Sequence, residues 1–437
     1  MEWLVAGSVV LLCLYMAWTI GANDVANSMG AAVGSGCITI RQALVIAAIF
    51  EFAGAVLVGS DVTDTIRKGI VEPSALAKSP EVLCLGMACA LLASALWLHV
   101  ATWMGMPVST THSIVGAVAG FGVVAAGIQA VHWGKIVSIV ASWFISPIAG
   151  LVLGYIIFKF ILRSVLTRAQ PVVAASNVAP IIVFLTTLVL AMATLYDGMK
   201  NLLKPGGALA AWATGSRAIA AAVVVSLVCA GATWLLLRRR AQAQAGLPLA
   251  DQLRRVERLF IPLAVMAACS VSFAHGANDV ANAVGPLAAV VDLLKHGVVR
   301  KEVPVPLWIL GLGGVGIVLG LATYGYTVMR TIGKEITEIT PSRAVAAGIA
   351  TAATVLTCTR MGLPVSTSHC VVGAVLGVGL ARGLGAVNRR VVRNICGSWL
   401  ATVPAAAGMA MLLFVLGHYF GVDVFLKQLM PALPPAP

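Results

Sequence analysis

Long apolar runs recur along the chain, and they restrict its possible folds more than any other feature. The clearest are Leu4–Ile20, Ala43–Ser60, Val137–Ile157, Ile181–Leu195 and Ala218–Leu237. Each is close to the ~20 residues that a helix needs to cross a hydrocarbon core of about 30 Å. Only 10% of the residues are charged, against about 25% in soluble domains, which is too few to cover a soluble surface. The sequence therefore predicts an all-α, polytopic membrane protein with about 10–12 spans.

The net charge of +13 comes from basic residues that gather in short loops between the apolar runs, most clearly Arg238, Arg239, Arg240, Arg254, Arg255 and Arg258. Beside membrane spans, such clusters mark the cytoplasmic side. Because no basic stripe alternates with aromatic residues, no nucleic-acid partner is expected. We expect an integral, multi-pass protein of the cell membrane (inner or plasma membrane), surrounded by lipid. The nine cysteines show no CxxC spacing, so neither a disulfide framework nor a zinc site is expected.

The sequence contains an internal repeat. Two phrases occur twice, in the same order and at nearly the same spacing: Gly21–Asn27 returns as Gly276–Asn282, and Pro107–His112 returns as Pro364–His369 with one Thr-to-Ser change. A fainter echo pairs Ser142-Trp143 with Ser398-Trp399. Such recurrence indicates duplicated halves. We therefore divide the chain into a first transmembrane repeat at 1–170, a two-span linker with a basic cytoplasmic loop at 171–256, and a second transmembrane repeat at 257–437.

Loop charges predict that the two halves are inverted. The loop at 129–135 has one basic residue, whereas its counterpart carries Arg382, Arg389, Arg390 and Arg393. The last span of the first half is followed by Lys159, Arg163 and Arg168, whereas the matching tail after His418 has only Lys427. By the positive-inside rule, these equivalent loops lie on opposite sides of the membrane, with the C-terminus outside. Inverted repeats are common in secondary transporters.

Two segments in each half are too long to be one straight span. The apolar stretch from Trp3 to Ile40 would be about 57 Å long as a single helix. We expect it to break at Gly21-Ala22-Asn23-Asp24, because Gly, Asn and Asp favour turns and caps. The stretch Glu81–Ile128 is expected to break near Gly105–Thr111, where Pro107 precedes a run of hydroxyl residues. Each half should therefore contain discontinuous helices or re-entrant hairpins with polar groups at membrane depth.

The second break in each half has the composition of an anion site. A half-helix that begins inside the membrane offers unpaired N–H groups and a partial positive charge. Six hydroxyl residues add donors there: Ser109, Thr110, Thr111, Ser366, Thr367 and Ser368. This set suits a tetrahedral oxyanion. Since it contains no Arg or Lys, bound cations would stabilise the anion.

The duplicated acids Asp24 and Asp279 are the candidate cation partners, because a carboxylate inside a span is costly and usually functional. The candidate Na⁺ ligands are hard oxygen groups, namely Asn23, Asp24, Asn27, Glu51, Asn278, Asp279 and Asn282. The alternative is that the Asn and Asp residues only cap broken helices. Glu51 has no acidic counterpart where Leu310-Gly311-Leu312 occupies the equivalent run. We expect it in a coupling site or a packing network, and the alternative is a position at the surface.

Three histidines lie in or beside the repeated motifs. His112 and His369 share one motif position, where they either carry protons or prop the hydroxyl loop, and the sequence does not separate these roles. His275 precedes the second acidic motif, but Ile20 stands at that position in the first. We expect His275 to matter little.

The paired motifs resemble those of the inorganic phosphate transporter (PiT) family. They are GANDVANS at Gly21–Ser28 and GANDVANAVGPL at Gly276–Leu287, each followed by P-V-S-T-[TS]-H. The resemblance covers nearly the whole chain and implies a cation-coupled phosphate symporter, a homodimer with both termini outside. It implies a phosphate site built from Asn23, Asp24, Ser109, Thr110, Thr111, Asn278, Asp279, Ser366, Thr367 and Ser368. Glu51 matches a family acid implicated in transport. The short linker departs from animal members, which carry a large cytosolic insertion.

Two alternatives to a phosphate symporter stay open at this point. Some bacterial members of the family carry sulfate, so a sulfate permease is the nearest alternative, and an anion channel is the next. Phosphate is favoured because it keeps a proton near neutral pH and can donate a hydrogen bond to a carboxylate, whereas sulfate only accepts. An enzyme is not expected, because no paired nucleophile and base, metal cluster or nucleotide loop is visible. No cofactor is expected beyond the coupling cation, Na⁺ or H⁺.

Overall fold

The structure is a computed structural model and describes residues 2–68, 70–72, 76, 79–106, 108–198, 216–297, 305–325, 338–383, 385 and 388–429. Within these ranges it contains helices and one isolated β-bridge, between Val71 and Val131, but no strand. Nine of the described helices are long and apolar enough to cross a membrane. They are α1 (Glu2–Gly34), α2 (Ile40–Val58), α4 (Pro80–Trp103), α6 (Trp133–Ile161), α7 (Pro171–Met192), α10 (Ser216–Gln242), α11 (Leu249–His296), α12 (Leu307–Tyr324) and α16 (Arg389–Tyr419). The predicted all-α, polytopic membrane fold is confirmed.

Shorter helices complete the bundle: α3 (Ser60–Lys68), α5 (Thr110–Ala126), α14 (Pro341–Arg360), α15 (Thr367–Arg382) and α17 (Val422–Leu429). Of these, α5 and α15 are apolar but too short to cross alone. The nine long helices therefore fall just below the predicted 10–12 spans among the described residues.

The expected break at Gly21–Asp24 is wrong. Helix α1 includes this motif without a break and is 33 residues long in total, or about 50 Å. Helix α11 includes the second copy in the same way and is 48 residues long, or about 72 Å. The glycines serve close packing instead. A Cβ atom on Gly21 would lie 1.9 Å from the carbonyl oxygen of Ile317, and one on Gly276 would lie 2.0 Å from that of Glu51. The motif glycine thus lets two helix backbones approach, as small residues do between membrane helices.

The second predicted break is present in both halves. Helix α4 ends at Trp103 and α5 begins at Thr110, while α14 ends at Arg360 and α15 begins at Thr367. The N-cap residue of α5 is Ser109, whose hydroxyl accepts a hydrogen bond from the backbone N–H of His112 at 3.2 Å. The N-cap Ser366 of α15 makes the same bond at 3.3 Å. Pro107, expected to stop the first helix, lies outside the described residues.

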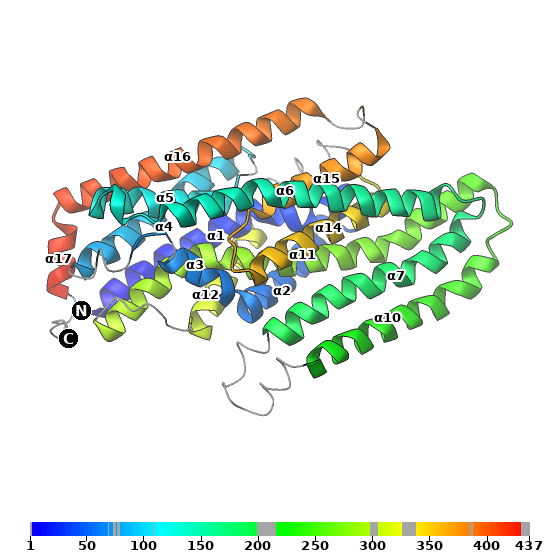
Figure 1. Cartoon of the computed structure of the whole chain (residues 1–437), viewed down its shortest axis with the longest axis horizontal. Helices are drawn as coiled ribbons and strands as arrows, with labels where there is room; N and C mark the ends of the chain where they lie inside the picture. The colour runs from blue at the N-terminus through cyan, green and yellow to red at the C-terminus, as the bar shows by residue number, and fades with distance from the viewer. Residues whose placement is uncertain are drawn as a thin grey trace.

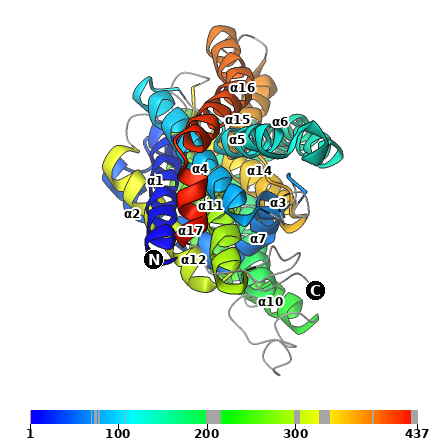
Figure 2. The same ribbon diagram turned by 90° about the vertical axis from the view of Figure 1, so that its left-hand side faces the viewer.

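The two halves pack into each other rather than side by side. Helix α1 of the first half packs along α12 of the second, and α11 packs along α2. In the same way α6 packs along α15, and α16 packs along α5 (Figure 1). Seen from the end that carries the N-terminus, α11 lies inside the bundle, and α6 and α10 lie at its edge (Figure 2). The interior therefore consists of paired elements from both halves.

The predicted linker contributes two neighbouring helices. Helices α7 and α10 pack against each other and lie at one side of the bundle (Figure 1). The domain boundaries at 170 and 256 stay predictions.

Basic side chains gather at one end of the long axis, which we call the basic end. The C-terminal end of α6 and the N-terminal end of α11 lie there, at the right of Figure 1, and the C-terminal end of α15 and the N-terminal end of α16 point the same way. The described basic residues at these helix ends are Arg163, Arg168, Arg254, Arg255, Arg258, Arg382, Arg390 and Arg393. The start of α1 and helix α17 lie at the opposite end (Figure 1).

Candidate functional site

Two buried carboxylates lie at the centre of the bundle, each beside a half-helix from the other half. Asp24 of α1 and Asp279 of α11 are 1% and 0% exposed. The hydroxyl of Ser368 in α15 donates to Oδ1 of Asp24 at 3.1 Å. The hydroxyl of Thr111 in α5 lies 3.3 Å from Oδ1 of Asp279 and can donate to it. The polar motifs that occur twice in the sequence are thus brought together across the two halves.

The same hydroxyls also link the two interrupted segments. Thr111 can donate to the carbonyl oxygen of Val365 at 3.0 Å, and Ser368 to that of Val108 at 3.2 Å. Because a hydroxyl carries one proton, each donates to either the carbonyl or the carboxylate at a given moment. These contacts occur in equivalent pairs. They support the predicted correspondence of the halves, whose inverted orientation stays a prediction.

A second hydroxyl residue in each half-helix, a threonine in both, also faces this centre. Thr367 donates to Oδ2 of Asp279 at 2.5 Å. Its counterpart Thr110 accepts a hydrogen bond from the side-chain amide of Asn282 at 3.3 Å. Four of the six predicted hydroxyl residues therefore gather around the two acids. Ser109 and Ser366 are the helix N-caps described above, so their hydroxyls serve the backbone.

The two later asparagines of the motifs present unpaired oxygens beside the acids. The amide of Asn27 donates to Oδ1 of Asp24 at 2.6 Å, and that of Asn282 donates to Oδ1 of Asp279 at 3.2 Å. The carbonyl oxygens of both side chains are buried and have no hydrogen-bond partner among the described residues. A buried carbonyl oxygen next to a carboxylate is a suitable ligand for a hard cation.

The two earlier asparagines hold the interrupted backbone instead. The amide of Asn23 donates to Thr102 and to the carbonyl oxygen of Met106, at 2.8 and 3.2 Å. Asn278 bonds in the same way to Thr359 and Leu363, at 2.9 and 3.3 Å. Backbone groups freed by a break at membrane depth need such partners. Both predicted ligands therefore bond to the interrupted segments, where their amide groups pair with backbone carbonyl oxygens freed by the break.

A third carboxylate, that of Glu51 in α2, is fully buried. Its Oε1 accepts a hydrogen bond from Ser28 at 3.0 Å and lies 3.3 Å from Nδ1 of His275. The equivalence with Leu310-Gly311-Leu312 is wrong. Gly276 packs on the backbone of Glu51 as Gly21 packs on that of Ile317, so Ile317 is the structural counterpart.

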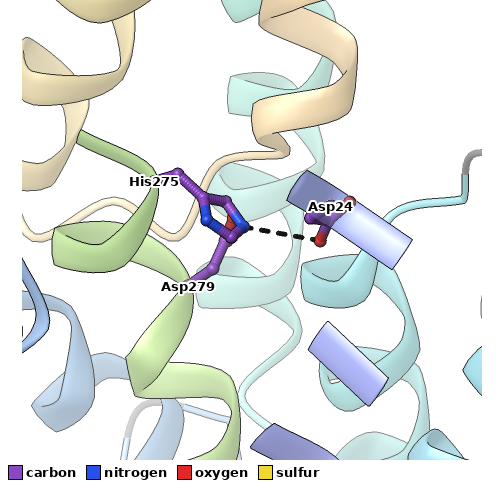
Figure 3. A group of neighbouring side chains, drawn as sticks. All are labelled: Asp24, His275 and Asp279. Atoms are coloured by element: carbon purple, nitrogen blue, oxygen red, sulfur yellow. Dashed lines mark ion pairs between the residues drawn. The ribbon is translucent and has the colours of Figure 1, made fainter. Parts of the chain in front are cut away.

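His275 lies among the three acids, contrary to the expectation that it matters little. Its Nε2 is 3.1 Å from Oδ2 of Asp279 and 3.7 Å from Oδ2 of Asp24 (Figure 3). One ligand atom from each of these three residues lies within 4.8 Å of the other two, a spacing that one cation can bridge. The sequence signal for this role was position: His275 precedes Asp279 by four residues, so both lie on one helix face.

The charges of this cluster favour a bound cation. Three carboxylates and one imidazole share a site with little or no exposure to water. Like charges that are buried together repel strongly, and an unpaired buried charge is costly. An anion in contact with the hydroxyls would add to this negative charge. Binding an anion here therefore requires cations or protons at the acids.

His112 and His369 each pack against the ring of a tryptophan. The His112 ring centroid is 3.7 Å from that of Trp143, and the His369 centroid is 3.6 Å from that of Trp399. The two imidazoles lie 4.5 Å apart, edge to face. Both tryptophans belong to the Ser-Trp pair that is repeated in the two halves of the sequence. This placement favours the propping role over proton transfer.

A bundle of membrane helices whose interrupted segments meet over buried acids and hydroxyls defines a membrane transport protein. The chain belongs to the phosphate transporter family, whose model matches residues 20–410. A putative phosphate permease of Pyrococcus abyssi is 45% identical over 414 residues, which is 93% of this chain and 96% of that protein. The chloroplastic inorganic phosphate transporter 2-1 of Arabidopsis thaliana is 42% identical over 426 residues, 95% of this chain and 71% of that protein.

A solved structure has the same fold. It is described as the sodium-dependent phosphate transporter, and it is 40% identical to this chain with a TM-score of 0.83. The match covers 95% of this chain and 99% of the solved chain. The resemblance to phosphate transporters is therefore confirmed in both sequence and fold.

Proposed function

We propose that this chain is a symporter that carries inorganic phosphate across the membrane, driven by a Na⁺ gradient. The observation that carries the proposal is the buried cluster of Asp24, Glu51 and Asp279 around His275. This cluster lies directly beside the hydroxyls that suit an oxyanion. Sodium is favoured over protons because the solved relative is described as sodium-dependent. In this role the protein changes no bond of its substrate, so it acts as a transporter and not as an enzyme.

In the proposed binding mode, phosphate lies between the starts of α5 and α15. Thr110, Thr111, Thr367 and Ser368 exchange some of their present contacts for phosphate oxygens. The N–H groups of the two half-helices add donors and a partial positive charge. Asp24 and Asp279 share cations with the anion, and one of them can accept the proton that phosphate keeps. Neither the cations nor phosphate then bind well alone, which is the physical basis of coupled transport.

We propose an orientation with the basic end in the cytoplasm of the cell, in agreement with the positive-inside rule. The start of α1 and helix α17 then lie at the outer surface. We also propose that the protein is a homodimer. Its mass in detergent, measured by light scattering after size-exclusion chromatography, checks the dimer.

Competition experiments test the substrate. Purified protein in liposomes is given labelled phosphate with an inward Na⁺ gradient, and unlabelled arsenate or sulfate is added in excess. Arsenate, which has the shape and protons of phosphate, should inhibit uptake, whereas sulfate should inhibit weakly. If sulfate inhibits as well as arsenate does, a sulfate permease with a cation-bridged site becomes the better reading.

A further inference from the structure

A small cavity lies next to the site, lined by segments of α1, α11, α14 and α15 that run from the acids toward the basic end. It begins at Asn27 and Ser28 and has room for about one water molecule. Its walls come from α1, α11, α14 and α15. They are built mostly from small side chains, including Ala31, Ala32, Ala264, Ala268, Ala344 and Ala347. We call this lining the small-residue seam.

Asn27 connects this seam to the site. Its amide donates to Asp24 and to Ser368, at 2.6 and 2.7 Å. Its carbonyl oxygen is buried and has no hydrogen-bond partner among the described residues. A buried unpaired carbonyl oxygen at the head of a cavity is a ready stopping point for a cation or a water molecule. The seam thus starts at a group that can take part in ion binding.

The duplicated halves provide an internal comparison, because each position of the seam has a counterpart in the other repeat. Aligning Gly21 with Gly276 and Ser109 with Ser366 gives the counterparts, and each of the four helices that line the seam has larger side chains at some of these positions. Leu287 corresponds to Ala32, Met87 to Ala344, Leu91 to Gly348 and Ile114 to Val371. All four larger residues are at most 2% exposed. The seam that leads to the opposite end is therefore packed with Leu, Met and Ile.

We propose that phosphate and its cations leave the site through the small-residue seam toward the basic end, and that α14 and α15 move to open it. This proposal rests on the proposed function. Around this cavity the Ala and Gly side chains do not interdigitate as Leu, Met and Ile do, so α14 and α15 can move without any large side chain leaving a packed hole. The opposite seam is the closed gate in this structure.

The location of Ser368 connects the opening of the seam to the release of substrate. Ser368 lies in the first turn of α15, on one side of the seam, and donates to Asp24 of α1 on the other. Movement of α15 away from α1 breaks this bond and also removes a hydroxyl from the proposed phosphate site. The same displacement therefore opens the route and weakens binding.

Substitutions that copy the other repeat test the route. Ala344→Met introduces the counterpart residue and should lower phosphate uptake into liposomes at least tenfold. Phosphate affinity in detergent, measured by calorimetry in Na⁺, should stay within twofold. Ala353→Met makes the same change on the same helix outside the cavity, and should transport at the wild-type rate. Wild-type uptake by Ala344→Met, or an equal loss in Ala353→Met, would overturn the proposal.

Thiol labelling gives a test that does not depend on transport. A membrane-impermeant thiol reagent is added from one side of oriented vesicles to the Ala347→Cys variant, and peptide mass spectrometry reads the modified residue. The introduced thiol should react from the basic end and be protected by Na⁺ with phosphate. The counterpart variant Ala90→Cys should react from neither side. Labelling of Ala347→Cys only from the opposite end would refute the route. Absence of phosphate uptake by the wild type would refute the proposed function alone.

Discussion

Replacing Asp279 by Asn is expected to abolish phosphate uptake at Na⁺ concentrations that saturate the wild type, while the protein stays folded in the membrane. Asn has the size of Asp and can still accept from Thr111. It loses the negative charge that faces His275 at 3.1 Å. With its carbonyl oxygen in the place of Oδ1, which accepts from Thr111 and Asn282, the new side chain turns its NH₂ group toward Thr367, whose hydroxyl donates to Oδ2 at 2.5 Å in the wild type. The cation loses its charged ligand, and the acceptor that bound these donors is partly lost.

The expected loss of cation affinity follows from the burial of the Asp279 carboxylate, which is 0% exposed. Removing one partner of a buried, hydrogen-bonded charge pair costs about 2–5 kcal/mol. Since Asn keeps part of the hydrogen bonding, the lower half of this range applies, about 2–3.5 kcal/mol. At ~1.4 kcal/mol per tenfold, this corresponds to roughly a 30- to 300-fold loss of cation affinity. Phosphate affinity measured at fixed Na⁺ should fall with it, because the two ligands stabilise each other.

The assay is the Na⁺ concentration that gives half-maximal phosphate uptake, supported by the rise in thermal stability that Na⁺ produces in detergent. The matched control is Asp292→Asn, which lies on the same helix and is also buried, 7% exposed, but pairs with His296 instead of the cluster. The control should behave as wild type. If Asp279→Asn requires no more than twice the wild-type Na⁺ concentration, the acid is not a coupling residue and the charge argument fails.

Three further substitutions probe other parts of the site. Thr110→Val and Thr367→Val each remove one hydroxyl and should weaken phosphate affinity about 5- to 150-fold, or ~1–3 kcal/mol; unchanged half-saturation in both would mean that these hydroxyls only bond to Asn282 and Asp279. Gly21→Ala should lower the melting temperature, because its Cβ would lie 1.9 Å from a carbonyl oxygen, whereas Gly7→Ala on the same helix meets nothing within 4 Å and should be neutral or stabilising. His275→Ile copies the first repeat and should abolish uptake with normal membrane insertion, and wild-type uptake would return His275 to a packing role.

The sequence predicts the helix breaks at the hydroxyl motifs correctly and the helix breaks at the Asn-Asp motifs wrongly, for a physical reason. At Ser109 and Ser366, proline, glycine and hydroxyl residues coincide, and only a stop followed by an N-cap satisfies them all. At Gly21 the glycine has two possible uses, a turn or a close helix crossing, and local sequence does not separate them. The length argument also failed there, because a helix longer than the bilayer can tilt or extend beyond it.

The candidate site was predicted in outline, with Glu51 among its expected cation ligands, but the central position of His275 was missed. Asp24 and Asp279 stand in identical motifs, so the repeat identified both. His275 has an apolar counterpart and Glu51 has Ile317, so a search for paired residues gives no signal for either. Their proximity depends on how α2 crosses α11, which is a property of tertiary packing. The role of Asn23 in holding the broken loop likewise requires the position of a hairpin some 80 residues away.

The central claim is that cations neutralise the buried acids while phosphate crosses the membrane. Uptake of labelled phosphate into liposomes tests it most directly, with a Na⁺ gradient and a pH gradient imposed separately on the wild type and on Asp24→Asn. The account predicts that the wild type accumulates phosphate above equilibrium with the Na⁺ gradient, and that the variant only equilibrates or stays inactive. Accumulation by the pH gradient alone would replace Na⁺ by H⁺ as the coupling ion. Equal, saturable uptake without any cation gradient, or full accumulation by the variant, would contradict the account.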